Sequence, residues 1–145
     1  MGKLILVILS SLLITSQVQA KTVDEYSQEE LQEIIGRYSG CTITKNIDNG
    51  SLNFKLVSVP AESGDFVYFI EITEPNADKV VIHLRKTHFL IGGYRMQATE
   101  EKMGLGWDIE VILVFLNGYD FKINSAKNGW IGETLEGYTH CKSLN

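Results

Sequence analysis

Three histidines are the first residues in this sequence that could do chemistry, because imidazole serves both as a zinc ligand and as a catalytic base. They stand at His83, His88 and His140. His83 and His88 are five residues apart, so they would face opposite sides of a continuous strand. The chain has no His-x-His or Cys-x-x-Cys pair, which are local spacings that support a bound metal. We therefore expect no metal site and no cofactor.

A second candidate for chemistry is the carboxylate pair Asp108 and Glu110, which would share one side of a strand. Glycoside hydrolases use two carboxylates as acid and base or nucleophile. These two lie at the outer end of a predicted hairpin, where charged side chains normally meet water. The sequence also lacks the Gly-x-Ser-x-Gly elbow, the P-loop and the Gly-x-Gly-x-x-Gly motif. We therefore expect a protein that is not an enzyme.

The two cysteines, Cys41 and Cys141, raise the question of a catalytic thiol, because His140 adjoins the second one. Neighbours on a strand point to opposite faces, which disfavours a Cys141–His140 pair. A disulfide is the preferred interpretation, and only one pairing is possible. Closing a loop of about 100 residues would contribute roughly 4–5 kcal/mol in the chain-entropy model.

The first twenty residues have the features of a secretory signal peptide. Lys3 supplies a positive charge, residues 4–14 are apolar apart from two serines, and residues 18–20 form a small-x-small cleavage site. The apolar run is short for a membrane span. We therefore expect a signal peptide at 1–20, a single exported domain at 21–145, and a periplasmic or secreted protein.

The charge balance narrows the class of partner. The formal net charge is −5, and it becomes −6 when Lys3 is removed with the signal peptide. An acidic surface disfavours nucleic acid and anionic membranes, which both attract clustered Lys and Arg. It suits a basic partner through long-range steering, although net charge also serves simply to keep a protein soluble.

One helix is predicted over residues 28–38. Ser27 and Glu30 form a capping box, and the apolar side chains that follow recur at helical spacing: Leu31, Ile34, Ile35 and Tyr38. Gly40 is expected to end the helical segment near Cys41. The stripe is typical of a helix that packs on a core.

The strongest predicted hairpin spans residues 107–123. Asn117-Gly118 between two apolar runs is typical of a two-residue type I′ turn, which would pair Leu116 with Tyr119. That register would put six apolar side chains on one face: Ile112, Val114, Leu116, Tyr119, Phe121 and Ile123. The first strand is apolar on its other face too, so we expect a cover there. Helix 28–38 is the expected cover, and a second copy of the chain, in a homodimer, is the alternative.

The remaining strands are expected at 41–46, 52–59, 66–73, 79–85 and 130–141, the last with glycines suited to close packing. Residues 88–91 and 94–98, on either side of Gly92-Gly93, are expected to form either a tight hairpin or one strand with a bulge. An Asn49-Gly50 turn would pair Ile47 with Leu52. The predicted fold class is therefore α+β, with one N-terminal helix on a mostly antiparallel sheet or sandwich of about eight strands and a Cys41–Cys141 disulfide.

Segment 92–107 is the expected binding region, because it combines glycines with residue types that are common in protein interfaces. The predicted partner-binding residues are Gly92, Gly93, Tyr94, Arg95, Met103, Leu105 and Trp107. The alternative is that Met103, Leu105 and Trp107 fold inward as core.

In architecture, the mature chain resembles periplasmic lysozyme inhibitors and the immunity proteins that protect bacteria from peptidoglycan-hydrolysing effectors. Several such inhibitors insert a loop with Ser-Gly-x-Tyr-like residues into the enzyme's cleft. Gly92-Gly93-Tyr94 is similar in its Gly and Tyr and lacks the Ser. The resemblance implies a binding protein that blocks a basic cell-wall hydrolase or effector. The alternative hypothesis is a barrel-like carrier of a lipid or other small molecule.

Overall fold

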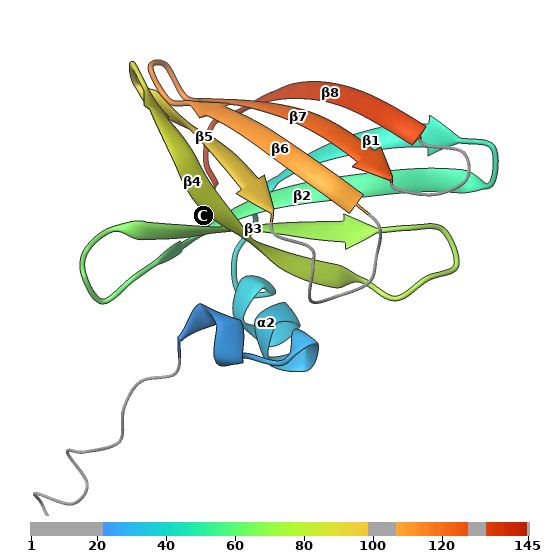
Figure 1. Cartoon of the computed structure of the whole chain (residues 1–145), viewed down its shortest axis with the longest axis horizontal. Coiled ribbons are helices and arrows are strands. Elements are labelled where there is room, and N and C mark those ends of the chain that lie inside the picture. The colour runs from blue at the N-terminus through green and yellow to red at the C-terminus, as the bar shows by residue number, and fades with distance from the viewer. Residues whose placement is uncertain (1–21, 99–106, 128–132, 145) are drawn as a thin grey trace, which may run out of the picture.

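The computed structural model describes residues 22–98, 107–127 and 133–144. A 3-10 turn, η1 (Val23–Glu25), and one short helix, α2 (Gln28–Ile35), precede eight strands (Figure 1). The strands are β1 (Cys41–Ile47), β2 (Gly50–Pro60), β3 (Phe66–Thr73), β4 (Val80–Leu90), β5 (Gly93–Ala98), β6 (Trp107–Val114), β7 (Tyr119–Lys127) and β8 (Glu133–Cys141). Across the described residues, no helix combines the length and the apolar character that crossing a membrane requires.

The eight strands form one sheet in which each strand pairs antiparallel with the next along the chain. The sheet curls until its two edges meet, so the structure is nearly barrel-shaped (Figure 1). The predicted disulfide joins β1 to β8 through Cys41 and Cys141, whose Cα atoms are 6.1 Å apart. At the same seam, a Cβ added to Gly137 would lie 2.7 Å from Ile43 Cγ2. The two edges therefore pack closely, as the glycine in the last predicted strand indicates.

The interior of the curled sheet is filled with large side chains. Every strand contributes inward-facing residues to this core, which include Phe54, Met96, Trp107, Leu113 and Phe121. The alternation between buried and exposed positions is clear along β6, where Trp107, Ile109, Val111 and Leu113 are buried. The core of the described residues therefore lies inside the curled sheet.

Helix α2 begins with the predicted capping box, in which Ser27 accepts from the Glu30 amide and Glu30 accepts from the Ser27 amide. The helix ends at Ile35, with Gly36 as its C-terminal cap, rather than continuing to residue 38. It has eight residues, so the molecule is largely β rather than a balanced α+β fold. The sequence was compatible with either one sheet or a sandwich of two, and the structure has one curled sheet.

The helix covers β2, β3 and β4 and not the strand for which the sequence predicted a cover. Leu31 and Ile35 pack on Val57, Phe69 and Val81, and Figure 1 shows α2 on the side of the molecule away from β6–β8. The prediction that helix 28–38 covers the second face of β6 was wrong.

The helix packs at this position because the start of β4 extends beyond the residues that pair with β5. Backbone groups along that edge of β4 are therefore available to bind the helix. The Gln28 side-chain amide occupies the free backbone edge of Val81: its Nε2 donates to the Val81 carbonyl, and its Oε1 accepts from the Val81 amide, both at 2.8 Å. Gln32 Nε2 also donates to the Lys79 carbonyl, at 2.6 Å. The helix is therefore fixed by backbone groups that a paired strand would not offer.

The β6–β7 hairpin forms where expected, but its register differs by one residue. Val114 pairs with Asp120 and Leu113 with Phe121. Gly118 has φ +103°, whereas Asn117 has no positive φ, so the two-residue type I′ turn is absent. A one-residue slip sends each side chain of one strand to the opposite face. The core therefore takes the odd-numbered residues of β6, and Ile112 and Val114 face outward, half-buried.

Candidate binding surface

Five large apolar side chains lie exposed at the tips of two neighbouring hairpins, and we call this surface the apolar tip. The β4–β5 hairpin contributes Phe89, Leu90 and Ile91, and the β6–β7 turn contributes Phe115 and Leu116. Ile91 is 95% exposed, Phe89 82% and Leu116 68%. The two hairpin tips lie side by side at one end of the molecule (Figure 1). A soluble monomer rarely exposes so many contiguous apolar side chains without a use for them.

Backbone and side-chain contacts hold the two hairpin tips together. The Phe115 amide donates to the Gly92 carbonyl at 2.8 Å. Gly92 has φ +71°, and a Cβ there would lie 2.5 Å from Leu116 Cδ2, so Leu116 lies directly over this glycine. Tyr94 links the hairpins from below, because its ring centre is 5.6 Å from that of Phe89 and 5.5 Å from that of Phe115. The tip is therefore organised before any partner binds.

The structure brings three of the predicted binding residues to the foot of the apolar tip. Gly92 lies in the β4–β5 turn, and Gly93 and Tyr94 begin β5. Gly93 is buried, and a Cβ there would clash with the Leu113 carbonyl. Arg95 follows on the outer side of the sheet, half-buried and paired in register with Ile112.

Trp107 lies apart from this group, at the far end of β6. It is 2% exposed, its ring packs edge-on against Phe54 with centres 5.9 Å apart, and its Nε1 donates to Glu74 Oε1 at 2.8 Å. Its place is the core, which the sequence left as the alternative. Met103 and Leu105 lie outside the described residues. Because β5 runs away from the tip, the described ends of segment 92–107 lie at opposite ends of the sheet.

A lysine and a buried tyrosine support the tip from the barrel side. Lys86 Nζ lies 4.3 Å from the ring centre of Tyr94 and 3.3 Å from Asp65 Oδ2. The pKa of Asp65 is lowered, chiefly by the backbone amide of Phe66 and then by Lys86. Burial raises the pKa of Tyr68 from its ordinary value of 10 to about 12. At the foot of the tip, the positive charge of Lys86 is therefore paired with the negative charge of Asp65.

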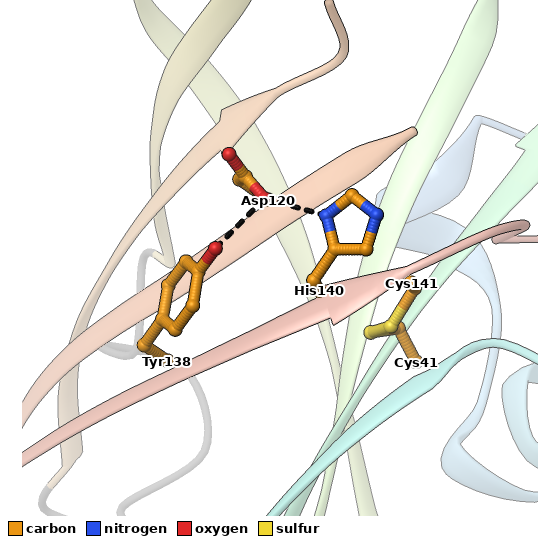
Figure 2. The surroundings of a disulfide bond; sticks show 5 residues. All are labelled: Cys41, Asp120, Tyr138, His140 and Cys141. Atoms are coloured by element: carbon orange, nitrogen blue, oxygen red, sulfur yellow. Dashed lines mark hydrogen bonds and ion pairs between the residues drawn. A yellow bond between two sulfur atoms is a disulfide. The ribbon is translucent and has the colours of Figure 1, made fainter. Parts of the chain in front are cut away.

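A polar cluster lies beside the disulfide, at the same end of the sheet (Figure 2). Asp120 Oδ1 accepts from Tyr138 at 2.9 Å and contacts His140 Nδ1 at 2.7 Å. The hydrogen bond from His140, followed by that from Tyr138, lowers the pKa of Asp120, and the same carboxylate raises the pKa of Tyr138. A carboxylate–histidine pair can activate a nucleophile, but the adjacent Cys141 is bound in the disulfide. The cluster therefore fits a structural role.

The other residues considered for chemistry lie on the outside of the sheet. Asp108 and Glu110 border a hollow of about 400 Å³ over β5–β8. His83 packs on Phe69, with ring centres 5.6 Å apart, while His88 is exposed near the tip. Within residues 22–98, 107–127 and 133–144, no three His, Cys, Asp or Glu side chains gather as metal ligands would.

Sequence reasoning missed the five residues of the apolar tip. The signal was present as Phe89-Leu90-Ile91 before a glycine pair and as Phe115-Leu116 before Asn-Gly. Consecutive apolar residues next to a turn cannot all face the core, because side chains alternate along a strand. No family model, curated protein or solved structure matches this chain.

Proposed function

We propose that this chain is an exported binding protein that blocks a peptidoglycan-degrading enzyme, as an inhibitor or as an immunity protein, and that it catalyses no reaction. The observation that carries the proposal is the apolar tip. Two hairpins present Phe89, Ile91 and Leu116 beyond the body of the sheet, in a shape that can enter a cleft. Enzyme active sites are typically concave clefts lined largely by apolar side chains, which a projecting apolar surface can fill.

The chemistry of the tip favours a protein cleft as its target. Burial of apolar surface contributes about 25 cal/mol per Å², so seating several of these side chains supplies several kcal/mol. The tip is held by the Phe115–Gly92 hydrogen bond and by the Tyr94 ring contacts, so little conformational freedom would be lost on binding. The proposed contact set is the tip together with Gly92, Gly93, Tyr94 and Arg95.

The choice of a cell-wall hydrolase rests on three further features. The acidic chain suits a basic enzyme, since opposite net charges accelerate association. The Cys41–Cys141 disulfide is compatible with an oxidising compartment such as the periplasm, where peptidoglycan lies. Gly92-Gly93-Tyr94 at the foot of the tip shares the Gly and the Tyr, but not the Ser, of the Ser-Gly-x-Tyr-like loop of periplasmic lysozyme inhibitors. The signal peptide at 1–20 lies outside the described residues and stays a prediction.

The test is inhibition of purified peptidoglycan hydrolases, with lysozymes, lytic transglycosylases and amidases assayed separately on cell-wall suspensions. We expect the protein to inhibit a basic member of one of these classes. Ile91→Ser/Leu116→Ser should weaken inhibition by about 100-fold, because loss of two exposed apolar contacts costs about 2–3 kcal/mol of binding. Both side chains are largely exposed, so the thermal midpoint should barely change.

The control is Phe66→Ser, which removes an exposed apolar side chain that lies outside the tip. It should leave inhibition intact. Failure to inhibit any of the three enzyme classes would contradict the proposal, as would binding through the tip to lipid vesicles alone.

A further inference from the structure

Asn117-Gly118 does not form the type I′ turn that its sequence predicts, so the pair is left without the role expected of it. Asn117 is exposed, in the turn that carries Leu116 of the apolar tip. Its carboxamide makes no hydrogen bond among the described residues. Glycine has no Cβ to hinder its own backbone nitrogen, so an exposed asparagine before a glycine is open to attack by that nitrogen. The pair is therefore a candidate site of covalent modification.

The Gly118 amide is free and lies close to a histidine. It has no hydrogen-bond acceptor within residues 22–98, 107–127 and 133–144. A Cβ added to Gly118 would lie 2.9 Å from His140 Nε2. Since a Cβ lies about 2.5 Å from its own amide nitrogen, His140 Nε2 is no more than about 5.4 Å from the Gly118 nitrogen. A proton can cross this separation through one bridging water.

His140 has the tautomer that a base at this position requires. Its Nδ1 lies 2.7 Å from Asp120 Oδ1 (Figure 2). The pKa of Asp120 is lowered, so its carboxylate is ionised and only accepts hydrogen bonds, and Nδ1 is the nitrogen that carries the proton. In the neutral ring, Nε2 is then the nitrogen with a free lone pair. Cys141 is bound in the disulfide, so the nucleophile within reach of this pair is the Gly118 amide.

We propose that Asn117 is a site of spontaneous deamidation, with His140 as the general base. The Gly118 nitrogen attacks Asn117 Cγ and gives its proton to His140 Nε2, and the Cγ–Nδ2 bond breaks as ammonia leaves with that proton. The product is a cyclic succinimide, which one water opens at either carbonyl. Attack at the side-chain carbonyl gives aspartate. Attack at the main-chain carbonyl gives isoaspartate, in which the backbone runs through an added methylene.

Asn49-Gly50 is an internal comparison at the β1–β2 turn. Asn49 is exposed as Asn117 is, and Gly50 also has a positive φ. Gly50, however, begins β2 and pairs with Ile47 across a two-residue turn, where the flanking residues exchange backbone hydrogen bonds. A Cβ at Gly50 would meet Pro75 and no histidine. The Gly50 amide is therefore engaged and has no base beside it.

Deamidation changes the chemistry of the apolar tip, and this consequence rests on the proposed function. Aspartate or isoaspartate places a negative charge next to Leu116, which is 68% exposed and proposed to enter an apolar cleft. Burial of an unpaired carboxylate in such a cleft is unfavourable. The modification therefore limits the time for which a molecule of this protein can bind its target.

The experiment is peptide mapping by mass spectrometry of the purified protein, sampled during long incubation at near-neutral pH. Replacement of NH by O changes the mass of the peptide that contains the modified residue. We expect deamidation at Asn117 to be at least about fivefold faster than at Asn49, because the Gly50 amide must first lose a hydrogen bond. His140→Gln should slow the reaction at Asn117 by about tenfold or more and leave the rate at Asn49 unchanged.

Equal rates at the two asparagines, or a faster reaction at Asn49, would overturn the proposal. A rate at Asn117 that His140→Gln leaves unchanged or raises would overturn the role of His140. Asn49 in the same molecule serves as the control, because a general loss of structure in the variant would accelerate the reaction there too.

Asn117→Gln is the matched variant for the effect on binding, because it keeps the carboxamide and must close a larger, less favourable ring. Its inhibition of a hydrolase should persist during incubation, whereas that of the fully deamidated unaltered chain should fall by at least about tenfold. An unaltered chain that deamidates and keeps its full inhibition would overturn the effect on the tip. The peptide map detects the modification whether or not a hydrolase is inhibited, so failure of the proposed function is distinguishable from failure of this inference.

Discussion

At the scale of single residues, glycines decide how closely the strands approach near the tip. Gly93 lies where β5 meets β6, and any Cβ there would clash with the backbone carbonyl of Leu113. Gly64, in the β2–β3 loop, differs in both respects: its φ is positive, at +83°, and a Cβ there would have nothing within 4 Å. Two positions that look alike in the sequence therefore have different physical requirements.

We expect Gly93→Ala to lower the free energy of unfolding by about 3 kcal/mol, because a backbone carbonyl cannot move aside without breaking the β5–β6 ladder. Gly64→Ala should cost about 1 kcal/mol, from the left-handed backbone conformation alone. Urea denaturation of both variants measures the difference. Equal losses for the two variants would show that the approach of Gly93 to Leu113 is unimportant.

The Asp120 cluster predicts a pH dependence of stability. His140 and Tyr138 hold the pKa of Asp120 below its ordinary value of 3.8 in the folded state. The folded state therefore favours the ionised carboxylate, and its contribution is fully present above about pH 4–5. That contribution is lost as the pH falls through the lowered pKa.

The measurement is the difference in thermal midpoint between the unaltered chain and Asp120→Asn, followed from neutral pH to below pH 3 by circular dichroism. The difference should be largest near neutral pH and shrink in acid. Subtracting the variant removes the contribution of Asp65, whose pKa is lowered too. A difference that grows as the pH falls would contradict the sign of this prediction.

At the scale of elements, the helix shows how a correct local prediction can have the wrong tertiary partner. The capping box and apolar stripe predict α2, and both are present. The position of α2 on the sheet depends on the free edge of β4 at Val81, whose backbone groups hydrogen-bond to the Gln28 side chain. That free edge exists because β4 begins several residues before its pairing with β5. The spacing of apolar residues in the helix carries no information about strand lengths, so it could not predict where the helix packs.

We expect Ile35→Ala to destabilise the protein by about 3 kcal/mol, because Ile35 is fully buried against the outer side of the sheet. Ile34→Ala, one position away and half-buried, should cost only about 1 kcal/mol. Guanidinium denaturation distinguishes the two. If Ile34 were the costlier position, the helix would face the sheet with a different side.

Two hairpins differ in how much a register error matters. At the β1–β2 turn the sequence pairs Ile47 with Leu52, whereas the structure pairs Ile47 with Gly50. That shift is two residues, so every side chain keeps its face. At the β6–β7 turn the shift is one residue, and the predicted inner face of β6 becomes its outer face.

At the scale of the whole molecule, the disulfide fastens the two ends of a meander. Strands β1 and β8 are the edges of the sheet, and no ladder among the described residues joins them. The bridge between Cys41 and Cys141 spans a sequence separation of 100 residues and ties these edges together. Covalent closure therefore replaces the hydrogen bonds that would complete the barrel.

We expect Cys41→Ser/Cys141→Ser to lower the free energy of unfolding by up to about 4–5 kcal/mol, because the unfolded chain regains the entropy of a long open loop. Hydrogen exchange should rise first in β1 and β8, at the released seam. The same measurement on the unaltered chain under reducing conditions is the control. Unchanged exchange at the seam would show that packing alone closes the sheet.

The sequence by itself determined the disulfide, the capped helix, the positions of most strands and the acidic charge. These depend on residue types and short periodicities, which act locally, or on there being only two cysteines. Only the tertiary structure decided which face of β6 points inward, where the helix sits and which apolar residues are left exposed. Each of those depends on register and strand length across the sheet, so a one-residue change at the β6–β7 turn moved Leu116 from the expected core to the apolar tip.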